Sequence, residues 1–194
     1  MIGILAIQGG VTEHEAILDE LGILHKRVAS LGDTEGLTGL ILPGGESTVM
    51  DMFMKKYGIG KWLCATAKAG QARAQDASFK VFGTCAGLIL LAKYGLLDVT
   101  VERNAYGRQI ASFAAEIPVN LSDGEVLVRG EFIRAPKILR VGGGVSVLGW
   151  LDGNAVLVRS GNIWGATFHP ELAGDGALHA AIFKGRRGFL VLGF

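Results

Sequence analysis

The sequence has few cysteines, little net charge and no long apolar run. Two cysteines among 194 residues are too few for a disulfide framework, and they have no metal-ligand spacing. Lys and Arg number 19 against 18 Asp and Glu, so the net charge is +1 and no phosphate-tracking surface is expected. No segment approaches the ~18 apolar residues of a membrane span, and residues 1–7 lack the basic flank of a signal peptide. We therefore expect a cytoplasmic protein that binds neither nucleic acid nor a membrane.

The composition indicates a globular protein. Apolar residues make up 49% of the chain and charged residues 19%, which excludes a disordered chain. The 30 glycines are about double the ~7% of average usage, so tight turns and close backbone approaches should be frequent. No repeat, linker or shift in composition divides the sequence. We expect one domain over residues 1–194, with a core large enough for independent stability.

The first half of the chain alternates apolar strands with helical segments. Strands are predicted at residues 2–7, 23–29, 37–42 and up to Phe82, and the first of them is a continuous apolar run of the kind found in strands covered on both faces. Thr12 and Glu15 have the form of a capping box, which predicts a helix with Thr12 as its N-cap and its end at Gly22. Further helices are predicted at 49–57, at 61–69 and from residue 88, with a polar connector at 70–78. This order predicts an α/β fold in which a mostly parallel sheet has helices on both faces.

The second half of the chain contains short strands between turn residues. They are predicted at residues 99–102, 125–129, 132–133, 138–141, 145–150 and 155–159, and a last strand at 163–168. We expect these segments to add antiparallel strands to the sheet.

The segment Gly83-Thr84-Cys85-Ala86-Gly87 joins a predicted strand to a predicted helix and has the form of a nucleophile elbow. A strand that turns into a helix within one or two residues holds the middle side chain in a strained conformation, and the flanking glycines leave room for that crossing. Cys85 would lie at a helix N-terminus, where the helix dipole favours a thiolate. The alternative is that Cys85 is a small buried apolar residue, as free cysteines often are.

Two further segments could complete a site around this thiol. His169 and Glu171 stand two residues apart at the end of the last predicted strand, so they share a face and could act as a base and its orienting carboxylate. The loop Pro43-Gly44-Gly45-Glu46-Ser47-Thr48 could turn backbone N–H groups toward a ligand, as an oxyanion hole requires. Each segment also has an ordinary explanation: a solvated strand end for the first, and a turn with Ser47 as N-cap for the second.

Three motifs together resemble the signatures of class I glutamine amidotransferases. They are Leu42-Pro-Gly-Gly-Glu-Ser-Thr48, Phe82-Gly-Thr-Cys-Ala-Gly87 and His169-Pro-Glu-Leu172. Other segments narrow the likeness to the glutaminase subunit of pyridoxal 5'-phosphate synthase, and the whole likeness runs over residues 2–172. These segments are Leu5-Ala-Ile-Gln-Gly9 with Glu13-His14, residues 101–109, and Phe132-Ile-Arg-Ala-Pro136.

The resemblance implies a flavodoxin-like fold and a role for each matching residue. Cys85 would attack the glutamine carboxamide, His169 would act as base and then as acid, and Glu171 would orient His169. The remaining site residues would bind L-glutamine or its oxyanion: Gly45, Glu46 and Ser47 with the substrate, Arg103 on its α-carboxylate side, Ile133 and Arg134 lining the pocket, and the N–H groups of Ala86 and Gly45 on the oxyanion. The partner would be the pyridoxal 5'-phosphate synthase subunit, and no cofactor or metal is implied on this chain.

Alternatives to this function remain at this stage. The chain could be the glutaminase of a histidine- or tryptophan-pathway enzyme, or a non-catalytic regulatory partner of the synthase. An elbow-cysteine protein of the DJ-1 type would share the fold and the nucleophile, but such proteins usually lack a His-Pro-Glu element on the final strand. The segment 8–10 and His14 are predicted to face the partner. By analogy residues 184–194 should form an amphipathic helix, although their three glycines fit it poorly.

Overall fold

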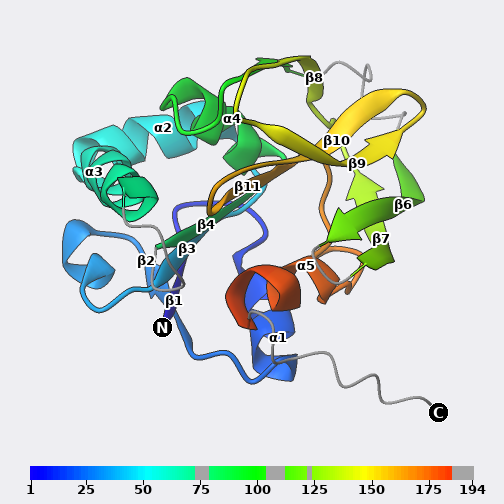
Figure 1. Ribbon diagram of the computed structural model, residues 1–194. Coiled ribbons are helices and arrows are strands. Elements are labelled where there is room, and N and C mark those ends of the chain that lie inside the picture. Colours follow the sequence, from blue (N-terminus) through cyan, green and yellow to red (C-terminus); the bar gives the residue numbers. More distant parts are fainter. Residues whose placement is uncertain (73–78, 104–111, 122–123, 185–194) are drawn as a thin grey trace.

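The computed structural model describes residues 1–72, 79–103, 112–121 and 124–184 (Figure 1). The strands of its main sheet are β1 (Ile2–Leu5), β2 (His25–Val28), β3 (Gly39–Leu42), β4 (Lys80–Thr84), β6 (Phe113–Leu121), β7 (Gly124–Phe132), β9 (Ser146–Leu151), β10 (Asn154–Ser160) and β11 (Ile163–Ala166). In the described residues these nine strands lie in the order β2-β1-β3-β4-β11-β10-β9-β6-β7. β5 (Val99–Glu102) and β8 (Lys137–Val141) form a separate antiparallel pair.

The sheet is parallel on one side and antiparallel on the other. β2, β1, β3, β4 and β11 are paired in parallel, whereas β10, β9, β6 and β7 are joined through antiparallel pairs. This arrangement confirms the predicted α/β class and the antiparallel additions from the second half of the chain. That residues 1–194 form one domain stays a prediction.

Helices cover both faces of the sheet (Figure 1). The described helices are α1 (Val11–Glu20), η1 (Leu31–Thr34), α2 (Ser47–Lys56), α3 (Ile59–Ala72), α4 (Ala86–Lys93), α5 (Ala177–His179) and η3 (Ala180–Lys184). One apolar cluster joins α2, α3 and α4 to the sheet, and a second cluster joins α1, α5 and η3 to it. The strands β1, β3 and β11 are buried along their whole length, which explains their apolar composition, whereas the edge strand β2 has the sequence His-Lys-Arg-Val and is only partly buried. In the part of the chain that the structure describes, no helix has the length and apolar character needed to cross a membrane.

The predicted start of the first helix is wrong. Helix α1 begins at Val11 with Gly10 as its N-cap, and no side chain caps it. Thr12 donates its hydroxyl hydrogen to Glu13, while the Glu15 carboxylate accepts two hydrogen bonds from Arg27 on β2, at 2.8 and 2.7 Å. A bidentate, charge-assisted pair is stronger than a capping bond to a backbone N–H, so Glu15 is engaged with the neighbouring strand.

Several predicted boundaries in the rest of the chain also differ. Strand β6 is absent from the predicted elements. Pro118 at its centre is unusual for a strand, but Ile117 and Val119 on either side are buried in the core. Residues 125–129 and Phe132 belong to one strand, β7, and Ile133 follows its end. Helix α3 continues to Ala72, so the predicted connector at 70–78 begins as helix. Most of that connector, the segment 104–109 and the C-terminal segment 185–194 lie outside the described residues.

Helix α4 can cross close to β3 because Gly87 has no side chain. A Cβ atom at this position would lie 2.0 Å from the carbonyl oxygen of Leu42 on β3. Because this oxygen belongs to the backbone of a strand, it cannot move away as a side chain could. The close approach lets α4 start immediately after β4. The predicted tight crossing of the elbow is therefore present in the structure, and Gly87 is one of the residues that permit it.

The substitution Gly87→Ala tests this packing. In most helices such a change stabilises by about 1 kcal/mol, because alanine is the better helix former. Here we expect it to lower the free energy of unfolding by roughly 1–3 kcal/mol, as overpacking of a filled site does. Urea unfolding followed by circular dichroism measures the change. Gly143→Ala is the matched control, since a Cβ there meets nothing within 4 Å; equal stability of the two variants would contradict the packing argument.

Candidate active site

Cys85 occupies the strained turn between β4 and α4. Its φ of 47° and ψ of −99° lie in a region that non-glycine residues rarely adopt. The turn is held by its own backbone, because the Cys85 N–H donates to the Ala166 carbonyl on β11 at 2.8 Å. Cys85 is also the N-cap residue of α4, so the unpaired N–H groups of the first helical turn lie next to the sulfur. The geometry is that of a nucleophile elbow, as predicted.

His169 and Glu171 follow β11 and form a hydrogen-bonded pair. His169 Nδ1 donates to Glu171 Oε1 at 2.7 Å, and both residues are buried. Two backbone hydrogen bonds with Glu131 on β7 fix the position of His169, at 2.9 and 3.1 Å. His169 also interacts with the Cys85 side chain. The structure thus brings the three predicted triad residues together in the order thiol, imidazole, carboxylate.

The charges of this pair reinforce each other. Burial alone would lower the pKa of His169, but hydrogen bonds with Cys85 and Glu171 and the carboxylate charge raise it to about 10. Burial would raise the pKa of Glu171, but the neighbouring His14 and His169 lower it to about 2. At neutral pH His169 is therefore an imidazolium held by an ionised carboxylate.

The glycine loop after β3 packs directly on His169. A Cβ atom at Gly44 would lie 2.0 Å from His169 Cε1, so only glycine can occupy this position. The Gly44 carbonyl accepts a hydrogen bond from the Gly10 N–H at 3.2 Å, and the Glu46 N–H donates to the Gln8 side-chain oxygen at 3.1 Å. The loop after β1 thus holds the loop after β3 beside the imidazole.

Opposite charges meet at the mouth of the site. Arg103, directly after β5, donates to the Glu46 carboxylate at 2.9 Å and to the Thr48 hydroxyl at 3.2 Å. The Glu46 carboxylate also accepts from the Thr48 N–H, so Glu46 and not Ser47 caps α2. Glu46 and Arg103 remain about half exposed, and both can therefore reach a ligand.

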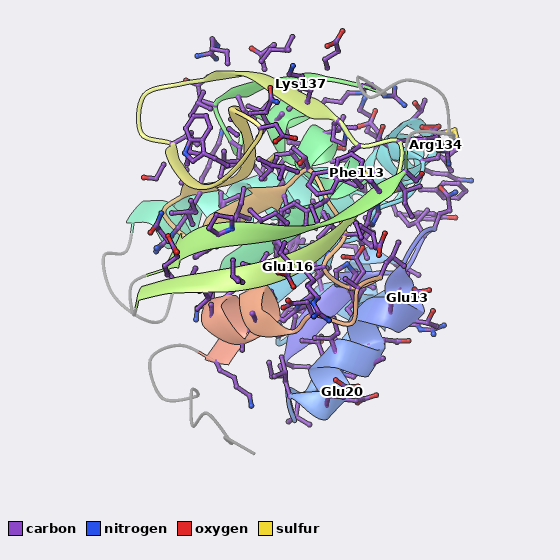
Figure 2. The ribbon with its side chains drawn as sticks, turned by 90° about the vertical axis from the view of Figure 1, so that its right-hand side faces the viewer. Glu13, Glu20, Phe113, Glu116, Arg134 and Lys137 are labelled. Atoms are coloured by element: carbon purple, nitrogen blue, oxygen red, sulfur yellow. The ribbon has the colours of Figure 1, made fainter. Side chains whose placement is uncertain are left out.

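A cavity of about 580 Å³ joins these groups. Its lining includes every predicted site residue except Glu171, which lies behind His169. Gly44, from the loop predicted to face a ligand, also lines the cavity. The sequence analysis assigned no part of the pocket wall to the other lining residues: Gln8, Gly9, Gly10, Glu13, Ile89 and Leu172. Arg134 has a positive φ of 46° and, like Glu13, lies toward the right-hand side of Figure 2. Within the described ranges, no group of three or more His, Cys, Asp and Glu residues is arranged to hold a metal ion.

His14 does not lie on a surface, contrary to its predicted place facing a partner. Its side chain is 0% exposed, because α1 packs its inner face on the sheet at this residue. His179 is equally buried, and the two rings are joined by a hydrogen bond of 2.8 Å between His14 Nδ1 and His179 Nε2. Burial lowers the pKa of His14 and lowers that of His179 to about 3, so both are neutral at pH 7.

Comparison with known proteins gives consistent results. The profile of the SNO glutamine amidotransferase family matches residues 4–184. The chain is 44% identical over 191 residues to pyridoxal 5'-phosphate synthase subunit PdxT of Corynebacterium diphtheriae, covering 93% of this chain and 97% of that protein. It is 42% identical to PdxT of Thermus thermophilus, with 92% and 94% covered. A crystal structure of a glutamine amidotransferase superposes with a TM-score of 0.85 at 41% identity, with 94% and 97% covered.

The two buried neutral histidines should make the fold sensitive to acid. An unfolded histidine binds a proton near pH 6.5, whereas folded His179 does so only near pH 3, so the unfolded state binds more protons between these values and stability falls as the pH is lowered. The contributions of His169 and Glu171 nearly cancel between pH 6.5 and 4.5. Unfolded His169 is only half protonated at pH 6.5 and unfolded Glu171 only half ionised at pH 4.5, and the two effects on stability have opposite signs. His179 alone should cost on the order of 2–3 kcal/mol across this interval.

Urea unfolding of the wild type and of His179→Phe at pH 6.5 and 4.5 tests this expectation. The variant should lose less stability between the two pH values, because it has one fewer group to protonate on unfolding. Ile182→Val changes the core without removing a titrating group, so it should lower the free energy of unfolding by the same amount at both pH values. An identical pH dependence in wild type and His179→Phe would show that His179 is not held neutral.

Proposed function

The chain belongs to the SNO glutamine amidotransferase family, and on this basis we propose that it is the glutaminase subunit of a pyridoxal 5'-phosphate synthase. Membership of the family implies glutaminase activity. The proposed reaction converts L-glutamine into L-glutamate and ammonia, and the ammonia passes to the synthase subunit. The main structural support is the thiol, imidazole and carboxylate of Cys85, His169 and Glu171, aligned beside the cavity.

The charges at the cavity mouth match a free amino acid. The α-carbon of glutamine carries an ammonium and a carboxylate, and the mouth offers one group of each opposite sign. Glu46 would bind the α-ammonium, and Arg103 the α-carboxylate. Gly45, Ser47, Ile133 and Arg134 would line the channel for the rest of the substrate, so the side chain would extend from the charged mouth toward Cys85. A substrate without both α-substituents would lose part of this binding.

The first half of the proposed reaction forms a thioester. The Cys85 thiolate attacks the δ-carbon of the glutamine carboxamide, and the carbonyl oxygen becomes an oxyanion. We propose that the N–H groups of Ala86 and Gly45 stabilise it, as expected from elbow geometry. His169 then donates its Nε2 proton to the amide nitrogen, which leaves as ammonia. Because His169 Nδ1 is hydrogen-bonded to Glu171, only Nε2 is available for this transfer.

The second half hydrolyses the thioester. Neutral His169 accepts a proton from a water molecule, whose oxygen attacks the same δ-carbon, now the carbonyl carbon of the thioester. The C–S bond breaks, glutamate leaves, and the imidazolium and thiolate pair is restored. Glu171 remains ionised throughout and keeps Nε2 directed at the reacting atoms. No step requires a cofactor or a metal ion.

The proposal also covers the partner and the compartment. A synthase subunit in a hetero-oligomer would receive the ammonia, since the relatives are named as subunits of that enzyme. We propose a cytoplasmic location, because the nucleophilic thiol has to stay reduced and the cytosol keeps thiols reduced. Similarity over more than nine-tenths of the chain to proteins of that name favours this synthase over the histidine- and tryptophan-pathway enzymes.

Replacement of the nucleophile is the direct test of the reaction. Cys85→Ala should abolish glutamate release, because no thioester can form, and should leave the far-UV circular dichroism unchanged. Cys64→Ala is the control, since Cys64 lies in α3 outside the cavity and its thiol donates a hydrogen bond to the Tyr94 carbonyl. Trapping with labelled glutamine should mark the wild-type chain and not the Cys85→Ala chain. Retained activity without the Cys85 thiol would refute the proposed function, and so would a non-catalytic wild type.

Partner dependence gives a second test. An isolated glutaminase would release ammonia to solvent, so we expect the synthase subunit to raise glutamate release, on the order of 10²–10³-fold if docking completes one oxyanion donor. Glutamate release is measured with and without the synthase, and then with Gln8→Ala, which removes the hydrogen bond to the Glu46 N–H. The variant should respond less to the synthase. Full activity of the isolated chain, unchanged by the synthase, would instead indicate a free-standing amidase.

A further inference from the structure

A chain of buried polar side chains lies behind Glu171, and none of its members lines the cavity. It consists of His14 on α1, Thr84 at the end of β4 and His179 on α5, all 0% exposed. His14 Nδ1 lies 2.8 Å from His179 Nε2, and His14 Nε2 lies 3.4 Å from Thr84 Oγ1. The Thr84 hydroxyl donates to Glu171 Oε1 at 3.2 Å, and His14 Nε2 lies 3.6 Å from the same oxygen. The contacts therefore end on the atom that holds His169.

The direction of the hydrogen bonds follows from what each group can donate. An ionised carboxylate only accepts, so the Thr84 hydroxyl has to donate to Glu171, and the Thr84 oxygen can then only accept from His14. His14 Nε2 consequently carries the hydrogen. Since His14 is neutral, its Nδ1 accepts, and His179 Nε2 donates to it.

This assignment explains an unpaired atom in the core. His179 Nδ1 has no hydrogen-bond partner among the described residues. In the assigned tautomer this nitrogen is a bare acceptor. The opposite tautomers would bury an unpaired N–H there and turn a lone pair of His14 toward the Glu171 carboxylate, and unpaired buried N–H groups are rare in proteins. All donors in the chain therefore point toward Glu171.

The second carboxylate oxygen shows why these donors matter. Glu171 Oε2 is buried and has no hydrogen-bond partner in the described part of the chain. Besides the backbone N–H of Glu171 itself, the hydrogen bonds that orient the carboxylate are therefore those to Oε1. We propose that His14, Thr84 and His179 form a positioning unit that fixes Glu171 Oε1 against His169, and so sets the direction of the catalytic imidazole. The expected effect on kcat rests on the proposed function, whereas the positioning of Glu171 rests only on the contacts described above.

Neutral donors suit this role better than a cation would. A protonated His14 would form an ion pair with Glu171 and compete with His169 for the same oxygen. Burial keeps His14 neutral, so its N–H dipole holds the carboxylate without cancelling the charge that stabilises the imidazolium. The polar groups that face Glu171 are His14 from α1, Thr84 from β4, His169 after β11 and the backbone N–H of Glu171 itself. Glu13 from α1 acts on His14 through its charge, and His179 from α5 is hydrogen-bonded to His14.

Kinetics of paired variants test the unit. Thr84→Val removes the hydroxyl and keeps the shape, whereas Thr84→Ser keeps the hydroxyl. His14→Phe removes both ring nitrogens, whereas His14→Gln keeps a donor near the position of Nε2. We expect Thr84→Val and His14→Phe to lower kcat on the order of 10–100-fold, by analogy with the loss of residues that orient metal ligands. KM for glutamine should change little, because neither residue lines the cavity. Thr84→Ser and His14→Gln should recover most of kcat.

A background variant separates positioning from general damage. If His14 acts through Glu171, then His14→Phe added to Glu171→Ala should cost little more than Glu171→Ala alone. His25→Gln on β2, outside the cavity and the triad, should keep wild-type kinetics. A full additional loss in the double variant, or a rise in KM with kcat unchanged, would overturn the proposal. Should His14→Phe fail to fold, Thr84→Val and Thr84→Ser decide the matter.

A measurement without turnover distinguishes this inference from the proposed function. The His169 imidazole can be titrated by NMR in the folded chain, where its pKa is raised to about 10. Loss of the donors on Glu171 should lower that titration midpoint in Thr84→Val and restore it in Thr84→Ser. An unchanged midpoint together with wild-type kcat would refute the positioning unit while leaving the glutaminase intact. A chain without glutaminase activity that shows the shifted midpoint would refute only the proposed function.

Discussion

The backbone conformation of Cys85 is the constraint on which the site depends. A non-glycine residue at φ 47° costs about 1–3 kcal/mol, and it persists only where the surroundings enforce it. Here β4 is paired on both sides, the Cys85 N–H is bonded to Ala166 on β11, and Gly87 lets α4 rest against the Leu42 carbonyl. The central strands thus hold the strain, and they fix the direction of the thiol without help from a flexible loop.

Parallel pairing then explains how distant segments meet. β1, β3, β4 and β11 are neighbours, so their carboxyl ends lie along one edge of the sheet, where ligands of open α/β sheets usually bind. The loops after these strands supply Gln8, Gly44, Cys85 and His169, which line one cavity although 161 residue numbers separate the first from the last. Each of these four residues follows a strand of the sheet, which fixes its position. The site therefore inherits its precision from the core.

The sequence predicted those parts that depend on local pattern. Apolar runs, flanking glycines and the spacing of His169 and Glu171 are local, and the structure places these segments as expected. The errors involve tertiary partners. Glu15 does not cap the first helix as predicted, because it accepts two charge-assisted hydrogen bonds from Arg27. β6 pairs with β7 even though Pro118 lies at its centre. The role of His14 could not be foreseen, because the segments that bury it lie up to 165 residues away along the chain.

The polar side chains behind the triad stabilise the core less than apolar side chains would. Two buried histidines and an unpaired nitrogen weaken the fold in acid, whereas apolar side chains of similar volume would fill the same space at no such cost. Sequences break the rules of core packing mainly at functional sites, where the loss of stability is offset by a gain in activity. Glu171 supplies that reason here, because a carboxylate with one bare oxygen needs donors on the other to keep its orientation. The sensitivity of the fold to acid and the activity of this protein would then depend on the same buried histidines behind Glu171.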